Sequence, residues 1–180
     1  MFEAYFQNEL LTGENKICCD GCAMRKDSVK SLRITKPPNI LIIHLKRFAF
    51  DKGLIMKLNR PVRFPIHDLN LTHYFHDTSN GLLHKYNLFG VVFHNGTCQG
   101  GHYTAATKET FSDKWIFYDD QRWGEFPVEH FQKSEIRQRA YLLFYIKNDL
   151  KAFRRQTLSN FENRLTFMKM QSSMKQVADF

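Results

Sequence analysis

Three apolar runs of strand length limit what this 180-residue chain can fold into more than any other feature. They are ILIIHLKRF at 40–48, YNLFGVVFH at 86–94 and AYLLFYI at 140–146. β-Branched and aromatic residues dominate these runs, as they do in strands that are buried on both faces. We therefore expect three strands of one sheet, with residues 40–48 in its centre.

Shorter patterns add to this sheet. Further strands are predicted at 29–34, 62–64, 102–108 and 115–118, with turn signals at Asn95-Gly96 and Gly100-Gly101. Pro127 stands at a first helical position, and residues 127–139 predict one helix. Strands joined by short turns, with a helix set apart from them, indicate an α+β fold with an antiparallel sheet.

The chain changes character after Asn148. Apolar residues follow at helical spacing, with arginine and lysine between them: Leu150, Phe153, Leu158, Phe161, Leu165 and Met168. This spacing predicts an amphipathic helix. We therefore expect two parts, a folded domain over residues 1–148 and a basic helical tail over residues 149–180.

Composition excludes several classes of protein. A hydrophobic fraction of 43% and an aromatic fraction of 14% argue for a packed core and against disorder. No apolar run approaches the roughly 20 residues of a membrane-spanning helix, and the first residues lack the features of a secretory signal. Three of the four cysteines lie within residues 18–22, which is a poor disulfide framework. A reducing compartment, the cytoplasm or the nucleus, is therefore expected.

The net charge of +8 is compatible with a nucleic-acid or membrane-surface protein. Half of it comes from residues 147–180, where seven basic and three acidic residues give +4. However, no basic run is interleaved with aromatic residues in the way that single-strand binders require. We interpret the charge as a solvated surface and expect no nucleic-acid partner and no membrane span.

The stretch Gly100-Gly101-His102-Tyr103 has the form of a catalytic histidine site. A histidine that acts as a base must be reachable by its substrate. Two glycines before it remove side chains, so that a peptide can pass close to the backbone. The alternative is a turn glycine pair beside an ordinary strand histidine. His94, which closes the preceding strand, is expected to pack near the same place.

The stretch Trp115 to Asp120 (WIFYDD) follows His102 after a short strand and a turn. A β-hairpin of this length can return Asp119 to the side of His102. A carboxylate there accepts the imidazole N–H, fixes its tautomer and stabilises the imidazolium. The alternative is an acidic surface turn, since aspartate is common at strand ends.

Taken together, these stretches resemble the ubiquitin-specific protease family of cysteine deubiquitinases. The resemblance runs from about Phe6 to Tyr145. It is carried by residues 15–22 leading into 29–34, LKRF at 45–48, the segment 62–64, YNLFGVVFHNGTCQGGHYTAATK at 86–108, WIFYDD at 115–120 and AYLLFY at 140–145. GGHY alone is not specific, whereas its combination with a Trp-led DD motif and a terminal aromatic strand is.

The resemblance implies the antiparallel sheet lobe, the palm and fingers part, of a papain-like ubiquitin-specific protease domain. In such enzymes a cysteine thiolate attacks the carbonyl of ubiquitin's terminal glycine. His102 matches the catalytic histidine, which acts as base and then as acid. Asp119 matches the residue that orients the imidazole, and Asp120 supports the site.

The resemblance also implies substrate contacts and a partner. Tyr103 matches a contact to the ubiquitin tail, Gly101 lets that tail pass close to the backbone, and Phe48 matches an apolar contact to the body of ubiquitin. The expected partners are ubiquitin and ubiquitinated proteins.

The family's nucleophile lies in a segment of the form Gly-Asn-Thr-Cys-Tyr, which these 180 residues do not contain. Because a base without a nucleophile performs no acyl transfer, we expect the isolated chain to be an inactive, truncated part of a longer enzyme. Cys98, four residues before His102, is the alternative nucleophile. It lacks the helix N-terminus that lowers a thiol pKa from about 8.5, so we expect a passive loop thiol.

Cys19 and Cys22 form a CxxC pair that resembles the family's second zinc knuckle. Structural zinc takes four ligands, so this pair is half a site, to which Cys18 or a nearby histidine could add a third ligand. The alternative, which we favour for the chain by itself, is a turn without metal. No cofactor is expected for catalysis.

Three hypotheses about function follow. The chain is part of an enzyme that hydrolyses ubiquitin isopeptide bonds, a non-catalytic ubiquitin-binding or partner-dependent module, or a basic protein that acts on nucleic acid or membranes through its tail. Turnover of a ubiquitin conjugate that is lost in His102→Ala would support the enzyme. Salt-insensitive binding of ubiquitin would support the non-catalytic module, and binding that weakens steeply with salt would support the basic protein. We favour the first.

Overall fold

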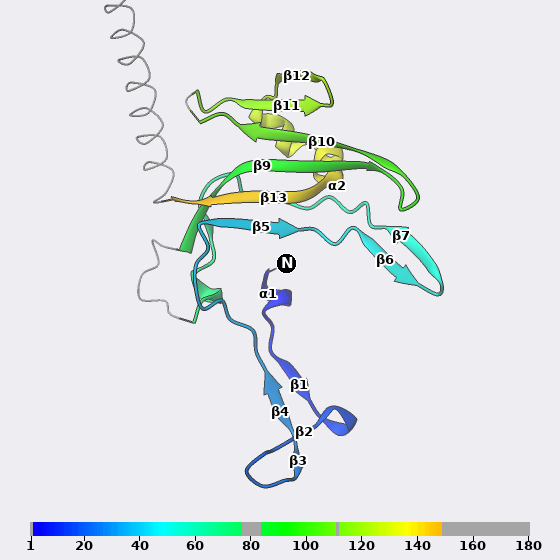
Figure 1. The fold of residues 1–180 in the computed structure, drawn as a ribbon, viewed down its shortest axis with the longest axis vertical. Coiled ribbons are helices and arrows are strands. Elements are labelled where there is room, and N and C mark those ends of the chain that lie inside the picture. The colour runs from blue at the N-terminus through cyan, green and yellow to red at the C-terminus, as the bar shows by residue number, and fades with distance from the viewer. Residues whose placement is uncertain (1, 77–83, 111, 149–180) are drawn as a thin grey trace, which may run out of the picture. The chain divides into compact units, whose positions relative to one another are not determined.

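Strands dominate the described part of the chain, which comprises residues 2–76, 84–110 and 112–148 in a computed structural model (Figure 1). These residues fall into two units. The first lies within Met1–Pro37 and Leu71–His84, and the second within Pro38–Asn70 and Lys85–Phe180. The predicted tail helix of residues 149–180 lies outside the described residues. Among the described residues, no helix has the length and apolar character that crossing a membrane requires.

The second unit is built on an antiparallel sheet in the order β12-β11-β10-β9-β13-β5, with β8 also paired to β9 (Figure 1). The strands are β5 (Ile40–His44), β8 (Leu69–Asn70), β9 (Lys85–Gly96), β10 (Gly101–Lys108), β11 (Trp115–Asp119), β12 (Arg122–Glu125) and β13 (Ala140–Lys147). The prediction of an antiparallel α+β fold is confirmed, as are the strands predicted at 86–94, 102–108, 115–118 and 140–146.

Aromatic residues fill the core of this unit. Tyr86 of β9 and Tyr145 of β13 are fully buried, and each hydroxyl donates to a proline carbonyl, that of Pro38 (3.1 Å) and Pro65 (2.7 Å) respectively. Burial raises the pKa of Tyr145, which keeps its hydroxyl protonated. On the sheet face that carries Trp115, Phe131 packs edge-on against that ring at 4.7 Å. Phe131 belongs to the 3₁₀ helix η4 (Val128–Gln132), which covers this face together with α2 (Ser134–Arg139).

Two predictions about the sheet are wrong. Residues 40–48 do not form a central strand, because β5 lies at the edge of the sheet and leaves Ile42 56% exposed. The run also breaks at residues 45–47 and continues into a hairpin of β6 (Phe48–Asp51) and β7 (Leu54–Lys57). β-Branched residues favour a strand, but they do not say whether the strand has one neighbour or two.

Two other elements also differ from prediction. Residues 62–64 form no strand, since prolines stand on both sides of them and supply no N–H to a ladder. The helix predicted over 127–139 is divided at Lys133, whose ψ of 137° is extended, into η4 and α2.

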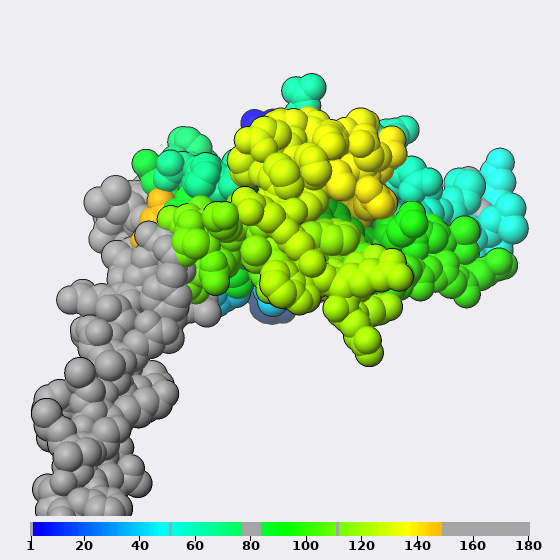
Figure 2. Space-filling view, turned by 90° about the horizontal axis from the view of Figure 1, so that it is seen from above, coloured from blue at the N-terminus to red at the C-terminus, as the bar shows by residue number. Residues whose placement is uncertain are grey.

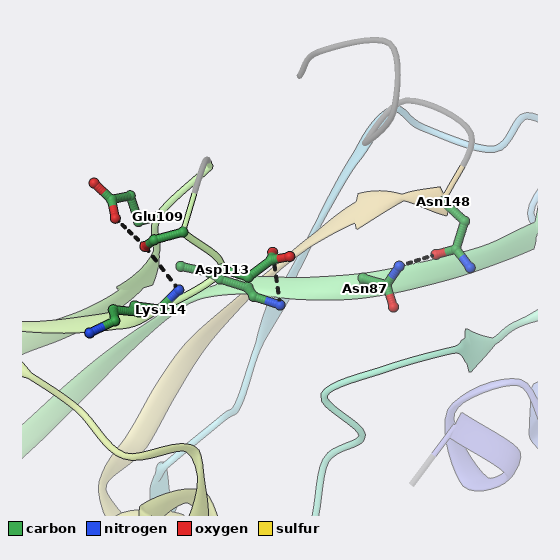
Figure 3. Close-up of polar contacts among 7 residues, drawn as sticks. Asn87, Glu109, Asp113, Lys114 and Asn148 are labelled. Atoms are coloured by element: carbon green, nitrogen blue, oxygen red, sulfur yellow. Dashed lines mark hydrogen bonds and ion pairs between the residues drawn. The ribbon is translucent and has the colours of Figure 1, made fainter. Parts of the chain in front are cut away.

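Polar side chains gather at one end of the sheet, where β9 begins and β10 and β13 end (Figure 3). In the β10–β11 turn, the carboxylate of Asp113 lies 3.2 Å from the amine of Lys108. At the end of β13, Asn148 accepts a hydrogen bond from the Asn87 amide at 2.7 Å and donates one to Asp68 at 2.9 Å. These bonds fix where β9 begins and β13 ends.

The first unit is made of short pieces. They are α1 (Phe2–Tyr5), β1 (Glu9–Leu11), the 3₁₀ helix η1 (Gly13–Asn15), β2 (Ile17–Cys18), β3 (Arg25–Lys26), β4 (Ser28–Lys30) and the 3₁₀ helix η2 (Thr72–Tyr74). β1 pairs with β4, and β2 with β3. The strand predicted over 29–34 is thus shorter, and Ile34 forms only an isolated bridge to Phe75. Phe6 stacks on Tyr74 at 4.7 Å, which joins the two segments of this unit.

Candidate active site

His102 and Asp119 meet at one end of two adjacent strands. His102 is the second residue of β10 and Asp119 the last residue of β11, and the two strands pair with Ala105 opposite Tyr118. The turn between the strands therefore returns Asp119 toward the start of β10. The Nε2 atom of His102 lies 2.5 Å from Oδ1 of Asp119, with 49% and 43% of the two side chains exposed.

This contact fixes the chemical state of the imidazole. An ionised carboxylate only accepts hydrogen bonds, so Nε2 carries the proton and the lone pair of the neutral ring lies on Nδ1. The hydrogen bond that the ring N–H donates to Asp119 raises the pKa of His102 above its usual value, and the charges of Asp119 and Asp120 raise it further. Partial desolvation opposes this rise. The arrangement suits a histidine that takes up a proton at Nδ1 and is stabilised as the cation.

Asp120 completes an acidic cluster around His102. Its backbone lies in the left-handed region (φ 51°), which aspartate tolerates better than most residues. One ligand atom from each of His102, Asp119 and Asp120 lies within 4.8 Å of the others, a donor set that would also suit a divalent cation. Since these groups are at least partly exposed and two of them bond each other, the simpler role of Asp120 is electrostatic.

Asp119→Asn is expected to lower the pKa of His102 toward its ordinary value of 6.5, because it removes the charged acceptor. An NMR titration of the His102 ring measures this change. The raised pKa also means that the pair stabilises the fold fully below about pH 6.5, and that this contribution is lost as pH rises through the folded-state pKa. A His102 titration that does not change in the variant would contradict the assignment of Asp119 as its partner.

The predicted substrate residues Phe48, Gly101 and Tyr103 line one pocket of about 440 Å³. The remaining lining residues are Ile55, His94, Thr97, Cys98, Gln99 and Gly100. His102 is not among them, because successive residues of a strand point to opposite faces and Tyr103 takes the pocket side. His102 and Asp119 therefore stand beside the pocket, with the backbone of residues 100–103 between this pair and the lining side chains.

His94 explains why residue 101 is glycine. It is buried (4% exposed) and lies opposite Tyr103 in the ladder, with the two ring centres 4.8 Å apart. A Cβ atom at Gly101 would collide with the His94 ring and the Asn95 carbonyl. Burial lowers the pKa of His94, and the nearby charge of Lys57 lowers it further, so its ring is neutral at pH 7. The sequence placed His94 near the site but gave no sign of this packing role.

The cysteines predicted from the sequence fall in both units. Cys98 belongs to the pocket lining, and its exposed thiol contacts the carbonyl of Ile55 at 3.6 Å. Cys19 and Cys22 stand on the turn between β2 and β3, where the Cys22 N–H donates to the Cys19 carbonyl at 3.3 Å. Backbone N–H groups of Gly21 and Cys22 lower the pKa of the Cys19 thiol, and the Cys22 side chain adds to this effect. A thiol stabilised as thiolate in a CxxC turn fits half of a tetrahedral zinc site.

Comparison with known proteins gives one consistent result. Residues 4–145 match the family model described as ubiquitin carboxyl-terminal hydrolase. Ubiquitin carboxyl-terminal hydrolase 10 of Arabidopsis thaliana is 38% identical over 144 residues, which is 79% of this chain and 15% of that protein. Ubiquitin carboxyl-terminal hydrolase 2 of Gallus gallus is 37% identical over 141 residues, 78% of this chain and 38% of that protein.

Solved structures agree with the sequence comparison. The SAGA Ubp8/Sgf11/Sus1/Sgf73 DUB module bound to ubiquitin aldehyde matches with a TM-score of 0.66 and 31% identity, covering 80% of this chain and 32% of that one. The same module bound to monoubiquitin gives a TM-score of 0.67 and 30% identity, covering 80% and 31%. The chain thus spans less than two fifths of the length of these relatives. The match over residues 4–145 shows that this chain belongs to the ubiquitin carboxyl-terminal hydrolase family.

Proposed function

We propose that this chain is the histidine-bearing part of a cysteine deubiquitinase, which hydrolyses isopeptide and peptide bonds at the C-terminus of ubiquitin. The observation that carries the proposal is the 2.5 Å contact between His102 and Asp119 beside a pocket, in a member of this family. The names of the relatives and the ubiquitin bound to the matching DUB modules support it.

In the proposed reaction, a cysteine outside these 180 residues attacks the carbonyl carbon of ubiquitin's last glycine. His102 accepts the thiol proton at Nδ1 and then donates it to the leaving lysine amine. Asp119 holds the ring through Nε2 and stabilises the imidazolium, and the charge of Asp120 adds to that effect. Water then hydrolyses the thioester, with His102 again acting as base. The 180 residues alone supply the base and its partner, and are inactive by themselves.

The pocket is the proposed path of the ubiquitin tail. Gly100 and Gly101 leave the backbone accessible, while Tyr103 and Phe48 supply aromatic contact area. Ubiquitin and ubiquitinated proteins are thus the proposed partners, and no nucleic acid is needed. We place the second unit in the palm and the first in the fingers of a papain-like domain that ends near residue 148, before a helical tail. Four free cysteines fit a protein of the cytoplasm or nucleus.

The Cys19–Cys22 turn is proposed to hold a structural zinc together with ligands from elsewhere in the longer protein. Elemental analysis of the purified protein is expected to find zinc, and Cys19→Ser with Cys22→Ser to abolish it. Cys98→Ser is the matched control and should retain the metal. Equal zinc content in all three proteins would contradict the assignment.

The test of function is hydrolysis of a ubiquitin C-terminal fluorogenic amide by the protein in its longest natural form. Turnover, together with capture of the enzyme by ubiquitin that bears a C-terminal electrophile, is the expected result. The isolated 180-residue chain should show neither. Ubiquitin binding without turnover in the long form would overturn the proposal and leave a non-catalytic ubiquitin-binding module.

A further inference from the structure

We propose that Lys57 is a positioning residue for His102, because its ammonium group ties the β6–β7 hairpin to the end of β9 that faces His102. The catalytic readout of this inference rests on the proposed function, whereas its structural readout does not. Lys57 is the last residue of β7. Its Nζ atom donates to the carbonyl oxygens of His94 at 3.0 Å and Gly96 at 2.8 Å.

These two carbonyls flank the residue that is paired with His102. In the β9–β10 ladder, Asn95 lies opposite His102 and Gly96 opposite Gly101. A turn closed by the bond from the Thr97 N–H to the Gly100 carbonyl (2.9 Å) joins the two strands. The position of the 94–96 backbone therefore fixes where the first residues of β10 run.

Lys57 takes the place of a missing neighbour strand. β13 accompanies β9 along its other edge only as far as Phe93, which pairs with Ala140. Carbonyls beyond that point on the same edge lack a ladder partner, which is costly for the carbonyl of the buried residue His94 in particular. Two charge-assisted hydrogen bonds from one ammonium group satisfy them.

The charge of Lys57 is not explained by an ion pair. Among the residues that the structure describes, no carboxylate forms a salt bridge with it. Burial lowers its pKa, and the positive charges of Arg47 and Arg139 lower it further. The two carbonyl oxygens therefore stabilise the Lys57 ammonium in this partly buried position, and we assign this side chain the role of holding β9.

A second contact joins the same two segments. The Cys98 thiol meets the Ile55 carbonyl at 3.6 Å, and Phe48, the register partner of Lys57, lines the pocket together with Ile55. Figure 2 shows the hairpin, in cyan, and the β9–β10 turn, in green, side by side. Lys57 therefore joins the segment that walls the pocket to the segment that carries His102.

The experiment compares Lys57→Met, which keeps the length of the side chain, with Lys57→Arg, which restores a cationic donor. Lys46→Met, at an exposed lysine between β5 and β6, is the matched control for loss of charge. Hydrogen exchange by mass spectrometry reports on the peptide that spans residues 95–103 of the full-length protein. Lys57→Met is expected to speed exchange there and to lower kcat by about tenfold to a hundredfold. In Lys57→Arg, the exchange rate and kcat should both return close to the wild-type values. In Lys46→Met, both should equal those of the wild type.

Two outcomes would overturn the proposal. One is exchange and kcat in Lys57→Met that equal those of Lys46→Met. The other is faster exchange spread evenly over β9, β13 and β5, which would make Lys57 a general stabiliser of the sheet. If Lys57→Met does not fold, Lys57→Gln, which retains an amide donor, carries the same comparison. Absence of turnover in the wild type would refute the proposed function, while the exchange data would still decide the role of Lys57.

Discussion

His102→Ala in the full-length protein is expected to reduce kcat for ubiquitin hydrolysis by about a thousandfold or more. In the proposed mechanism, the substitution removes both the group that deprotonates the nucleophile and the acid that protonates the leaving amine. The proposed thiolate would also lose the imidazolium that lowers its pKa. Since His102 does not line the pocket, the Kd for ubiquitin should stay close to that of the wild type. Steady-state kinetics and a binding titration with free ubiquitin measure the two quantities.

Two further variants sharpen this result. Asp119→Asn keeps the shape of the side chain that contacts His102 but removes its charge. A large fall in kcat is therefore expected, and its size depends on how well the neutral amide orients the imidazole ring. His67→Ala, at an exposed histidine of the same unit that does not line the pocket, is the control and should leave kcat unchanged. Substantial turnover by His102→Ala would mean that another base serves the reaction, and the proposed role of His102 would be lost.

The sequence predicted the strands around this site because their patterns are local and strong. Continuous apolar residues at 86–94 and 140–146 leave few alternatives to buried strands, and the short β10–β11 connection limits where Asp119 can lie. The structure indeed brings Asp119 to His102, while the catalytic roles of the two residues stay a prediction. Two side chains of one hairpin are close in sequence, so their approach follows from local geometry.

Features that depend on distant contacts could not be predicted in this way. The edge position of β5 is decided by which strand lies beside β13, and no residue of 40–44 encodes that choice. The β6–β7 hairpin has exposed apolar residues, such as Phe50 at 76%, and so lacks the polar face that marks a surface hairpin. Lys57 and Arg47 look like ordinary surface cations in the sequence, because their partners are carbonyls from other segments.

Arg47→Met is expected to lower the free energy of unfolding by about 3–5 kcal/mol, the largest stability change we predict, because it leaves backbone carbonyls without a donor. Arg47 is 4% exposed, and its guanidinium has no carboxylate partner in the described structure. Instead it donates to the carbonyls of Ala140 (2.9 Å), Leu58 (3.2 Å), Arg60 (2.5 Å) and Arg137 (2.6 Å). It thereby joins the chain after β7, the end of α2 and the start of β13.

The loss in Arg47→Met comes from the carbonyls rather than from the charge. Each buried carbonyl left without a donor costs about 1–3 kcal/mol, which water can recover in part. Burial of the charged guanidinium is itself unfavourable, as the lowered pKa of Arg47 indicates, and the substitution removes this cost. The net loss of stability is therefore smaller than the sum over the four hydrogen bonds. Arg47→Lys keeps a charge but cannot reach all four oxygens, so an intermediate loss of about 1–3 kcal/mol is expected.

Thermal and urea unfolding measure these changes, and Arg63→Met, at an exposed arginine of the same unit, is the control. For a domain of this size, the predicted loss corresponds to a fall in Tm of about 6–20 °C, while the control should stay within about 0.5 kcal/mol of the wild type. A loss in Arg47→Met as small as that of the control would show that water replaces the guanidinium at no cost. The junction of β7, α2 and β13 would then be held by its apolar neighbours, and the arginine of the LKRF stretch would need another explanation.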